Sequence, residues 1–247
     1  MSYIDAHCHL QEVANQFDYS EILKMAENKD ISGWLSCALS REEIQWHQLN
    51  RSDKIKFSAG IHPIYDNGTQ LTLIDIETLI KEKQIFALGE IGLDKRNRNL
   101  SKQIALLKDQ ISLAKVYDLP CVFHVVGHYD LFYKILSDLP TRGIWHGFSA
   151  SKEIVRQFST FDLTFSIGHV LIDSLKHTII NEIIKYGNYL IETDAPYNLR
   201  KHNSTASEVQ NPLTTLVHYT NVVSRLNGVK IDSLKQDLMK NAKQYFI

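Results

Sequence analysis

Two histidines, His7 and His9, stand one residue apart at the end of an apolar N-terminal segment. Side chains two residues apart on an extended strand project to the same side, so both imidazoles can bind one cation. Further residues of metal-binding types follow apolar segments downstream, namely Glu90, His124, His146 and Asp194. Together, these imidazoles and carboxylates indicate a site for divalent metal ions.

The elements that must position these residues are predicted to be strands alternating with helices. Eight apolar segments bounded by turn residues predict strands over residues 2–7, 33–38, 56–60, 85–89, 120–125, 143–146, 162–167 and 188–193. Apolar residues recur at helical spacing over 100–114 and again over 172–183. Asn211 followed by Pro212 predicts a helix start, Gly228 its end, and residues 232–245 a last helix.

Eight repeats of strand and helix predict an α/β fold, a (β/α)₈ TIM-type barrel that forms a single domain over residues 1–247. The competing open, doubly wound sheet carries a G-x-G-x-x-G turn after its first strand. This sequence has His7-Cys8-His9 in that place. In a barrel, residues at the carboxyl ends of the strands converge although they lie far apart in the sequence.

Composition restricts the class of protein. The chain is 44% hydrophobic and 22% charged, which is typical of a globular protein, and its apolar runs are shorter than the roughly 20 residues that span a bilayer. The N-terminus lacks an export signal, and the three cysteines, Cys8, Cys37 and Cys121, fall in predicted strands as buried side chains. We therefore expect a cytoplasmic protein with no membrane association and no obligate protein partner. A net charge of −1 argues against a strongly basic nucleic-acid-binding surface, but leaves room for a local one.

The metal-type residues predict a centre with two divalent ions, in which one carboxylate bridges. Glu90 is the natural bridge, with one ion on His7, His9, Glu90 and Asp194 and the other on Glu90, His124 and His146. A water between the ions would become a nucleophile near neutral pH, and Asp194 would accept its proton. Zn²⁺, Mn²⁺, Ni²⁺, Co²⁺, Fe²⁺ or Mg²⁺ could occupy the sites.

The remaining histidines do not share this placement. A single histidine is more often structural than a ligand, and His47, His177 and His218 fall in predicted helices, where we expect surface or packing roles. His128 at most lines the pocket. His169 follows the seventh strand on the same rim, which makes it a candidate substrate contact.

Five segments resemble the TatD-related metal-dependent hydrolases in order and spacing: residues 4–10 (IDAHCHL), 60–63 (GIHP), 89–94 (GEIGLD), 146–149 (HGFS) and 192–197 (ETDAPY). The resemblance implies a TIM-type barrel, two metals on the matching residues, and hydrolysis of phosphodiester or other ester bonds, with deoxyribonuclease activity in several members. His62 matches a family histidine that is not generally a ligand. We expect it to contact substrate or to assist the leaving group.

One position departs from the family pattern. Many relatives continue the strand-five histidine as H-x-R, whereas this chain has Val126, which cannot bind phosphate as an arginine does. Two basic clusters in neighbouring loops favour a phosphate substrate nonetheless. They are Lys95, Arg96, Arg98 and Lys102 after strand four, and Arg200, Lys201 and His202 after strand eight.

The sequence therefore predicts a metal-dependent phosphodiesterase that acts on nucleic acid or a small phosphorylated substrate, with Arg96, Arg98 and Arg200 as candidate substrate contacts. The alternative within enzymes is hydrolysis of a neutral ester, lactone or amide by the same metal centre. A different class, a metal-stabilised binding protein without catalysis, would keep its ligand affinity in Asp194→Asn, whereas an enzyme would lose turnover.

Overall fold

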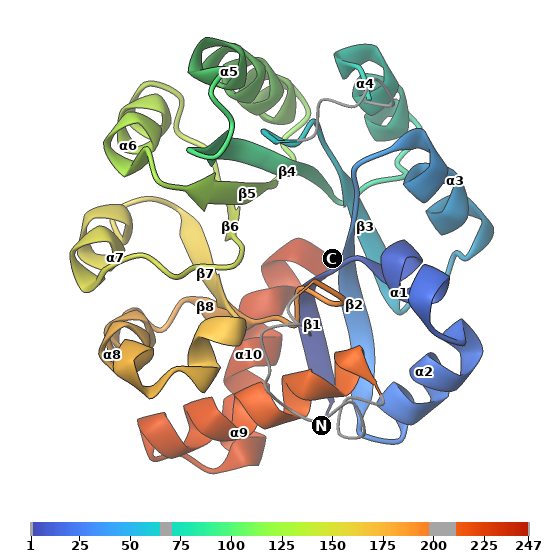
Figure 1. Cartoon of the computed structure of the whole chain (residues 1–247), viewed down its shortest axis with the longest axis vertical. Helices are drawn as coiled ribbons and strands as arrows, with labels where there is room; N and C mark the ends of the chain where they lie inside the picture. Colours follow the sequence, from blue (N-terminus) through green and yellow to red (C-terminus); the bar gives the residue numbers. More distant parts are fainter. Residues whose placement is uncertain (1, 65–70, 198–210, 247) are drawn as a thin grey trace.

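A single sheet of eight parallel strands, joined in chain order, forms the centre of the molecule (Figure 1). In this computed structural model, residues 2–64, 71–197 and 211–246 are described. The strands are β1 (Tyr3–Cys8), β2 (Ile31–Ala38), β3 (Ile55–Ala59), β4 (Ala87–Asp94), β5 (Cys121–Val126), β6 (Gly143–Trp145), β7 (Leu163–Ile167) and β8 (Tyr189–Ile191). All eight predicted strands are confirmed, with their order.

Helices surround the strands on the outside (Figure 1). They are α1 (Leu10–Gln16), α2 (Tyr19–Glu27), α3 (Arg41–Leu49), α4 (Leu73–Lys81), α5 (Leu100–Val116), α6 (Tyr129–Asp138), α7 (Lys152–Phe158), α8 (His177–Tyr186), α9 (Thr215–Asn227) and α10 (Ile231–Phe246), with the 3₁₀ turns η1 (His169–Ile172), η2 (Ser174–Lys176) and η4 (Pro212–Thr214). Among the described residues, no helix combines the length and apolar character that a membrane span requires. The strand and helix repeat confirms the TIM-type barrel.

The first and last strands meet through hydrogen bonds just beyond β8. The backbone N–H of Asp194 donates to the His7 carbonyl at 2.9 Å, and that of His9 donates to the Ala195 carbonyl at 2.8 Å. The buried Asp5 carboxylate accepts from the backbone N–H of Thr193 at 2.9 Å and from its hydroxyl at 2.6 Å. These bonds bring the residues after β8 against the histidines of β1.

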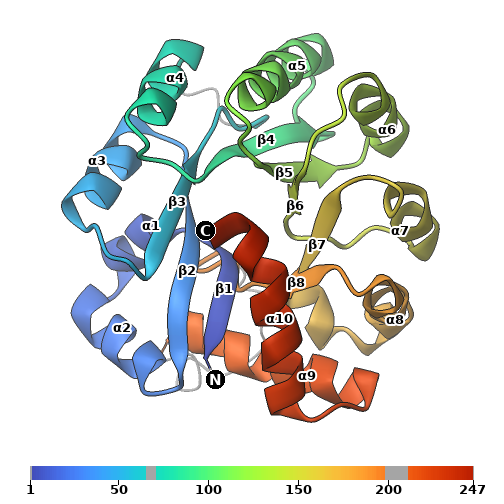
Figure 2. The same cartoon turned by 180° about the vertical axis from the view of Figure 1, so that it is seen from behind.

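The C-terminal helix α10 covers the opposite end of the barrel (Figure 2). Tyr245 donates from its hydroxyl to the carbonyl of Gly143, where β6 begins, at 3.0 Å. The Asn241 amide donates to the carbonyl of Tyr189, where β8 begins, at 3.0 Å. Tyr245 and Ala242 pack against buried residues of the barrel interior such as Leu190. The barrel is therefore covered where the strands begin, and its open mouth lies at their carboxyl ends.

Two elements differ from the predictions. The fourth strand does not end at Gly89 but continues to Asp94, so Glu90 lies within β4. A shift in the β4–β5 register between Gly89 and Ile91 leaves Glu90 out of the ladder. The helix predicted over 172–183 is also shorter, because α8 begins only at His177. Two 3₁₀ turns precede it, and Leu175 on the second is 85% exposed rather than buried.

The helix boundaries predicted from cap residues are confirmed. Asn211 accepts the backbone N–H of Leu213, Pro212 opens the 3₁₀ turn that leads into α9, and Gly228 ends α9 with a left-handed φ of 65°. Glycine takes this conformation without the steric cost that a Cβ brings. The last helix and the stripe of apolar residues along α5 also form as expected.

Candidate metal centre

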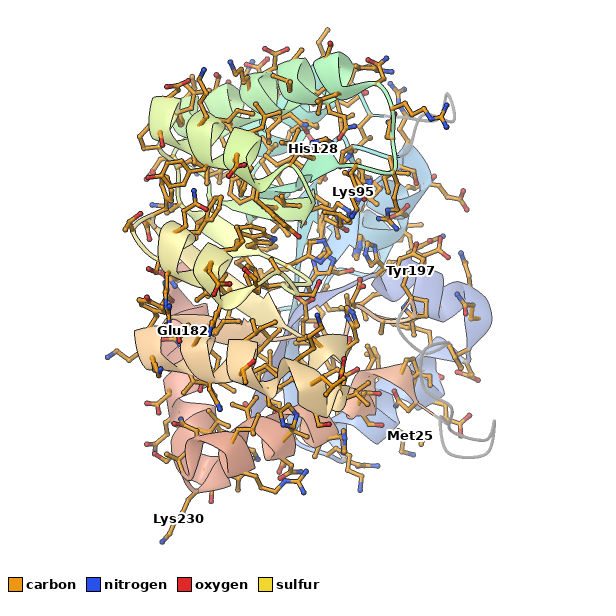
Figure 3. All side chains as sticks on the ribbon, turned by 60° about the vertical axis from the view of Figure 1, so that its left-hand side comes forward. Met25, Lys95, His128, Glu182, Tyr197 and Lys230 are labelled. Carbon is orange, nitrogen blue, oxygen red and sulfur yellow. The ribbon has the colours of Figure 1, made fainter. Side chains whose placement is uncertain are left out.

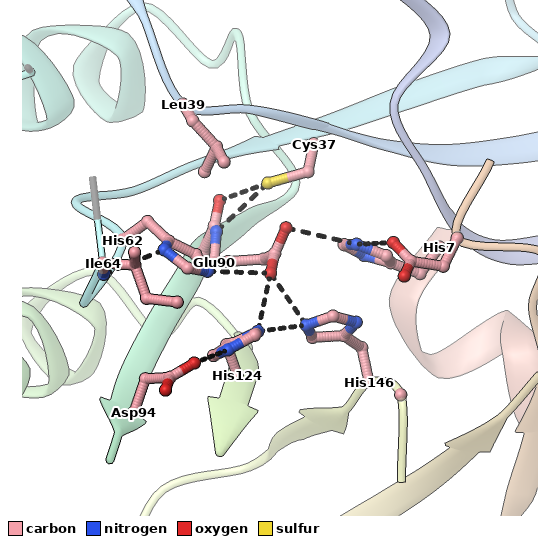
Figure 4. Close-up of polar contacts among 12 residues, drawn as sticks. His7, Cys37, Leu39, His62, Ile64, Glu90, Asp94, His124 and His146 are labelled. Carbon is pink, nitrogen blue, oxygen red and sulfur yellow. Dashed lines mark hydrogen bonds and ion pairs between the residues drawn. The ribbon is translucent and has the colours of Figure 1, made fainter. Parts of the chain in front are cut away.

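The six predicted metal ligands and His62, a predicted substrate contact, converge at the mouth of the barrel (Figure 4). They come from six of the eight strands or from the residues directly after them, so distant parts of the sequence form one cluster. His7 lies in β1, Glu90 in β4 and His124 in β5, whereas His9, His62, His146 and Asp194 follow β1, β3, β6 and β8.

Glu90 occupies the middle of this cluster, with its side chain only 3% exposed. Its Oε1 lies 3.3 Å from His7 Nε2 and 3.1 Å from His9 Nε2. Its Oε2 faces the other way, 2.7 Å from His146 Nε2 and 3.3 Å from His124 Nδ1. The two carboxylate oxygens therefore face two different pairs of imidazoles.

Asp194 completes the side formed by the two histidines of the first strand. Its Oδ1 lies 3.8 Å from His7 Nε2 and 3.7 Å from His9 Nε2, and its side chain is 19% exposed. The backbone has a left-handed φ of 53°, which aspartate tolerates better than most residues. Asp194 is thus the carboxylate of the cluster that is more open to the mouth.

The donor atoms fit divalent cations. Among the described residues there are three overlapping groups, and in each the ligand atoms lie within 4.8 Å of one another: His7, His9 and Asp194; His7, Glu90 and His146; and His62, Glu90 and His124. Imidazole nitrogens and carboxylate oxygens are the usual ligands of Zn²⁺ and related ions. Glu90 belongs to two of the three groups, as a bridging ligand would.

The third group includes His62, to which the sequence assigned a substrate role. Its Nε2 lies 3.5 Å from Glu90 Oε2, and its Nδ1 accepts the backbone N–H of Ile64 at 3.1 Å. Burial lowers the pKa of His62 to about 4, so the ring is neutral near pH 7 and carries its proton on Nε2. A proton on Nε2 favours the role of a donor to substrate over that of a ligand.

The carboxylates and imidazoles of the cluster shift one another's pKa values. Burial alone would raise the pKa of Glu90, but the charges of His146 and His7 and the imidazole hydrogen bonds hold it well below its usual range. Burial would lower the pKa of His146, yet Glu90 and Glu192 raise it well above its usual value. Without a cation, His146 therefore carries the positive charge that balances Glu90. A divalent cation would replace this proton.

The backbone around Glu90 is held by Cys37 on β2, a residue predicted only to pack as a buried side chain. The Cys37 thiol donates to the Gly89 carbonyl and accepts the backbone N–H of Glu90, both at 3.1 Å (Figure 4). Gly60 allows β3 to approach, because a Cβ there would lie 2.8 Å from the Gly89 backbone. Gly92 does the same toward β5, where a Cβ would lie 1.8 Å from the His124 carbonyl oxygen.

Two buried carboxylates that were not among the predicted site residues lie behind the histidines, and one of them, Asp94, is hydrogen-bonded to its histidine. Asp94 Oδ2 accepts a hydrogen bond from His124 Nε2 at 2.8 Å. Glu192 Oε1 lies 3.8 Å from His146 Nδ1 and accepts the backbone N–H of Gly147 at 2.6 Å. Carboxylates behind metal-binding histidines orient the rings and fix their tautomers. Both lie in segments quoted for the family resemblance, which was the available signal for them.

Helix α5 fixes the ends of two strands with glutamines seven residues apart. Gln110 accepts the backbone N–H of Ile61 at 2.7 Å and donates to its carbonyl at 3.2 Å. Gln103 accepts the backbone N–H of Asp94 at 2.7 Å and donates to its carbonyl at 3.1 Å. Both amides are buried. They satisfy backbone groups where the strands end, and so hold the neighbouring His62 and Asp94 in place.

Several of the predicted rim residues lie around this mouth. Lys95 and His128 lie at the ends of β4 and β5, and Tyr197 lies on the same side of the molecule (Figure 3). Arg98 is exposed, and His169 is half-buried at the start of η1. Arg96 makes a close ion pair with Asp94. Arg200, Lys201 and His202 lie outside the described residues.

The histidines assigned to helices have the expected surroundings. His47 is buried in α3, stacked on Phe57 at 4.7 Å, with its Nε2 3.1 Å from the Ser36 hydroxyl. His218 is exposed on α9 and His177 is half-buried at the start of α8. His47 therefore has a packing role.

Comparison with known proteins gives one consistent family. The model of the family described as TatD related DNase matches residues 4–247. The uncharacterized metal-dependent hydrolase MJ1582 of Methanocaldococcus jannaschii is 25% identical over 248 residues, covering 100% of this chain and 97% of that protein. The 3'-5' ssDNA/RNA exonuclease TatD of Klebsiella pneumoniae is 26% identical, covering 93% of this chain and 92% of that protein.

A solved structure agrees with the sequence comparisons. The crystal structure of YjjV, a TatD homolog from Escherichia coli K12, superposes with a TM-score of 0.82 at 24% identity. The match covers 99% of this chain and 97% of the other. With the family match over nearly its whole length, the chain belongs to the TatD-related DNase family of metal-dependent hydrolases.

Proposed function

We propose that this hydrolase cleaves phosphodiester bonds with two divalent cations bound at the barrel mouth. One cation would be held by His7, His9, Glu90 and Asp194, and the other by Glu90, His124 and His146. The observation that carries this assignment is the orientation of Glu90, whose Oε1 faces the histidines of β1 while its Oε2 faces His124 and His146. A carboxylate with two such faces suits a bridge between two ions.

The residues of the chain divide the chemistry between them. Bound cations would lower the pKa of a water and polarise the scissile ester. Asp194 would accept the proton of that water, because it lies open to the mouth, whereas Glu90 is buried among the imidazoles. His62, neutral and protonated on Nε2, would donate a hydrogen bond to the substrate or to the leaving group.

Charge and kinship support a phosphate-bearing substrate. Lys95 and Arg98 are exposed beside the mouth. Cations around a metal centre attract polyanions even on a chain whose net charge is only −1. The relative from Klebsiella pneumoniae is named an exonuclease for single-stranded DNA and RNA. We assign Arg98, Arg200 and His169 to contacts with nucleic acid or a small phosphorylated substrate.

A neutral ester, lactone or amide is the second candidate substrate, and one contact favours it. Val126 replaces an arginine on β5, and the Arg96 guanidinium nearby is paired with Asp94. The part of the mouth beside His124 therefore has less positive charge available to bind a phosphate than the sequence alone suggests.

An activity screen separates the candidates. The purified protein, loaded in turn with Zn²⁺, Mn²⁺, Ni²⁺, Co²⁺, Fe²⁺ or Mg²⁺, is tested on DNA, RNA, phosphate monoesters, cyclic phosphodiesters, lactones and acyl esters. We expect turnover of phosphodiesters, weakening as salt rises, and a further loss of affinity in Arg98→Gln. Turnover of neutral esters alone, unaffected by salt or by Arg98→Gln, would favour the second candidate.

A control variant addresses the possibility of binding without catalysis. Asp194→Asn should reduce turnover by orders of magnitude while substrate still binds, because the amide cannot accept a proton. If native protein and variant bind substrate equally and neither turns it over, the chain is a binding protein.

A further inference from the structure

Asp94 is a fully buried carboxylate at the end of β4, with a side chain 0% exposed. Three kinds of donor reach it. Its Oδ2 accepts His124 Nε2 at 2.8 Å, and its Oδ1 accepts the backbone N–H of Arg96 at 2.8 Å. The Arg96 guanidinium adds bonds from Nε to both oxygens, at 2.9 and 3.0 Å, and a further bond from Nη2. A carboxylate bound in this way stays ionised and accepts only.

This arrangement determines which nitrogen of His124 faces the cluster. An ionised carboxylate can only accept, and Asp94 Oδ2 lies nearer to Nε2, at 2.8 Å, than Glu90 Oε2 does to Nδ1, at 3.3 Å. The Asp94 bond therefore places a proton on Nε2 and leaves Nδ1 as the nitrogen available to a cation. Nδ1 lies 3.3 Å from Glu90 Oε2 and 3.0 Å from His146 Nε2 (Figure 4). His7, His9 and His146 instead face Glu90 with their Nε2 atoms. His124 is therefore turned the opposite way, and Asp94 accounts for that orientation.

Asp94 is itself fixed from two sides. Gln103 of α5 binds both backbone groups of Asp94, and Arg96 grips its side chain. Arg96 Nη2 lies 3.5 Å from His124 Nε2, so the guanidinium also lies against the imidazole. To bind a substrate phosphate through Nε and Nη2, Arg96 would have to release a buried carboxylate and leave it without its cation. That loss is strongly unfavourable.

We propose that Arg96 and Asp94 are positioning residues that fix the tautomer and orientation of His124, so that Nδ1 is its metal-binding atom. Arg96 then serves the metal centre rather than the substrate. This inference rests on the proposed metal centre for the identity of the ligand, but not on the identity of the substrate.

Metal affinity provides the first test. Substituting a carboxylate partner behind a metal-binding histidine reduces metal affinity by about 10–100-fold. We expect Asp94→Asn to lower the affinity for one of two bound Zn²⁺ or Co²⁺ ions by about this factor, as measured by chelator competition. The substitution should also change the visible absorption of the Co²⁺-loaded protein. Arg96→Gln should act in the same direction, with kcat falling and KM unchanged, and Arg96→Lys should restore part of the affinity.

Arg142→Gln is the matched control, because Arg142 Nη1 pairs with Asp118 Oδ1 at 3.3 Å, and Arg142 lies at the covered end of the barrel. It should change neither metal affinity nor KM. Unchanged metal affinity and Co²⁺ absorption in Asp94→Asn would overturn the proposal. A raised KM with unchanged metal affinity in Arg96→Gln would also overturn it, and would make Arg96 a substrate contact.

A measurement on the native protein covers the case in which a variant does not fold. Nitrogen NMR of histidine-labelled, metal-free protein reports the tautomer of each ring. We expect a proton on His124 Nε2, and a ring with its proton on Nδ1 alone would overturn the proposal. If the native protein binds no cation at all, the proposed function fails, whereas the tautomer of His124 and its dependence on Arg96 remain measurable.

Discussion

Glu90→Gln tests the central claim about the site with little change in side-chain shape. Glutamine keeps the size of the side chain but removes its charge and one of its two acceptor oxygens. Because each oxygen of Glu90 faces a separate pair of imidazoles, one substitution affects both halves of the cluster. We therefore expect the variant to retain at most one cation per chain with native-like affinity.

The size of the effect has a lower bound. A group that only supports a metal ligand is worth about 10–100-fold in metal affinity, and a bridging ligand should exceed the upper value. A loss of more than about 100-fold corresponds to at least about 2.8 kcal/mol at 1.4 kcal/mol per factor of ten. Removal of a buried charge that is paired with His146 should also lower the stability of the metal-free fold, by about 3–5 kcal/mol before relaxation.

Metal analysis and calorimetry measure this prediction directly. The native protein should bind two Mn²⁺ or Zn²⁺ ions per chain, and Glu90→Gln should lose one or both of them. Glu77→Gln is the matched control, because this substitution on α4 removes the same charge, whereas Glu77 contacts Lys81 and Tyr117 instead of the cluster. Two ions bound with native affinity by Glu90→Gln would refute the assignment of Glu90 as the bridge.

Three further substitutions test the surroundings of the cluster. His62→Gln should lower kcat/KM by about 10²–10³-fold with metal content unchanged, as for the loss of one hydrogen-bond donor to developing charge, whereas loss of an ion would make His62 a ligand. Cys37→Ala should lower the free energy of unfolding by about 1–3 kcal/mol in urea, because the backbone N–H of Glu90 loses its buried acceptor; unchanged stability would contradict this. Burial and the charge of His9 lower the pKa of His47 from 6.5 to about 4. The neutral ring therefore makes its full contribution to the free energy of unfolding above pH 6.5. About 3 kcal/mol of that free energy is lost as the pH falls toward 4, at 1.36 kcal/mol per pKa unit. Urea titrations of native protein and His47→Gln should therefore converge or cross toward acid pH, and parallel curves would contradict the pKa.

The repeating pattern of apolar segments was sufficient to predict the barrel, because burial on both faces makes parallel strands apolar on consecutive positions. Segments such as 85–89 and 120–125 are apolar on consecutive positions for this reason. The clustering of ligand-type residues was predictable for a related reason. A closed parallel barrel brings the carboxyl ends of its strands to one mouth, so the position of a histidine after a strand already places it.

Positions outside the regular repeat were harder to predict. Propensity indicates where β4 begins, but not that a register shift lets it continue past Glu90 to Asp94. The predicted start of the eighth helix at Ile172 was wrong for a similar reason, because α8 begins only at His177. Asp173 accepts the backbone N–H of Leu175 and starts a separate 3₁₀ turn, a local hydrogen bond that apolar periodicity does not reveal.

The sequence by itself determined which residue types stand after each strand, and hence the family and the set of candidate ligands. Only the tertiary structure decided how those side chains are oriented. Arg96 is a cation beside the mouth in the sequence, but the fold pairs it with Asp94 and so links it to His124. Orientation depends on which buried donor meets which acceptor across strands. Those pairings exist only once the barrel has closed.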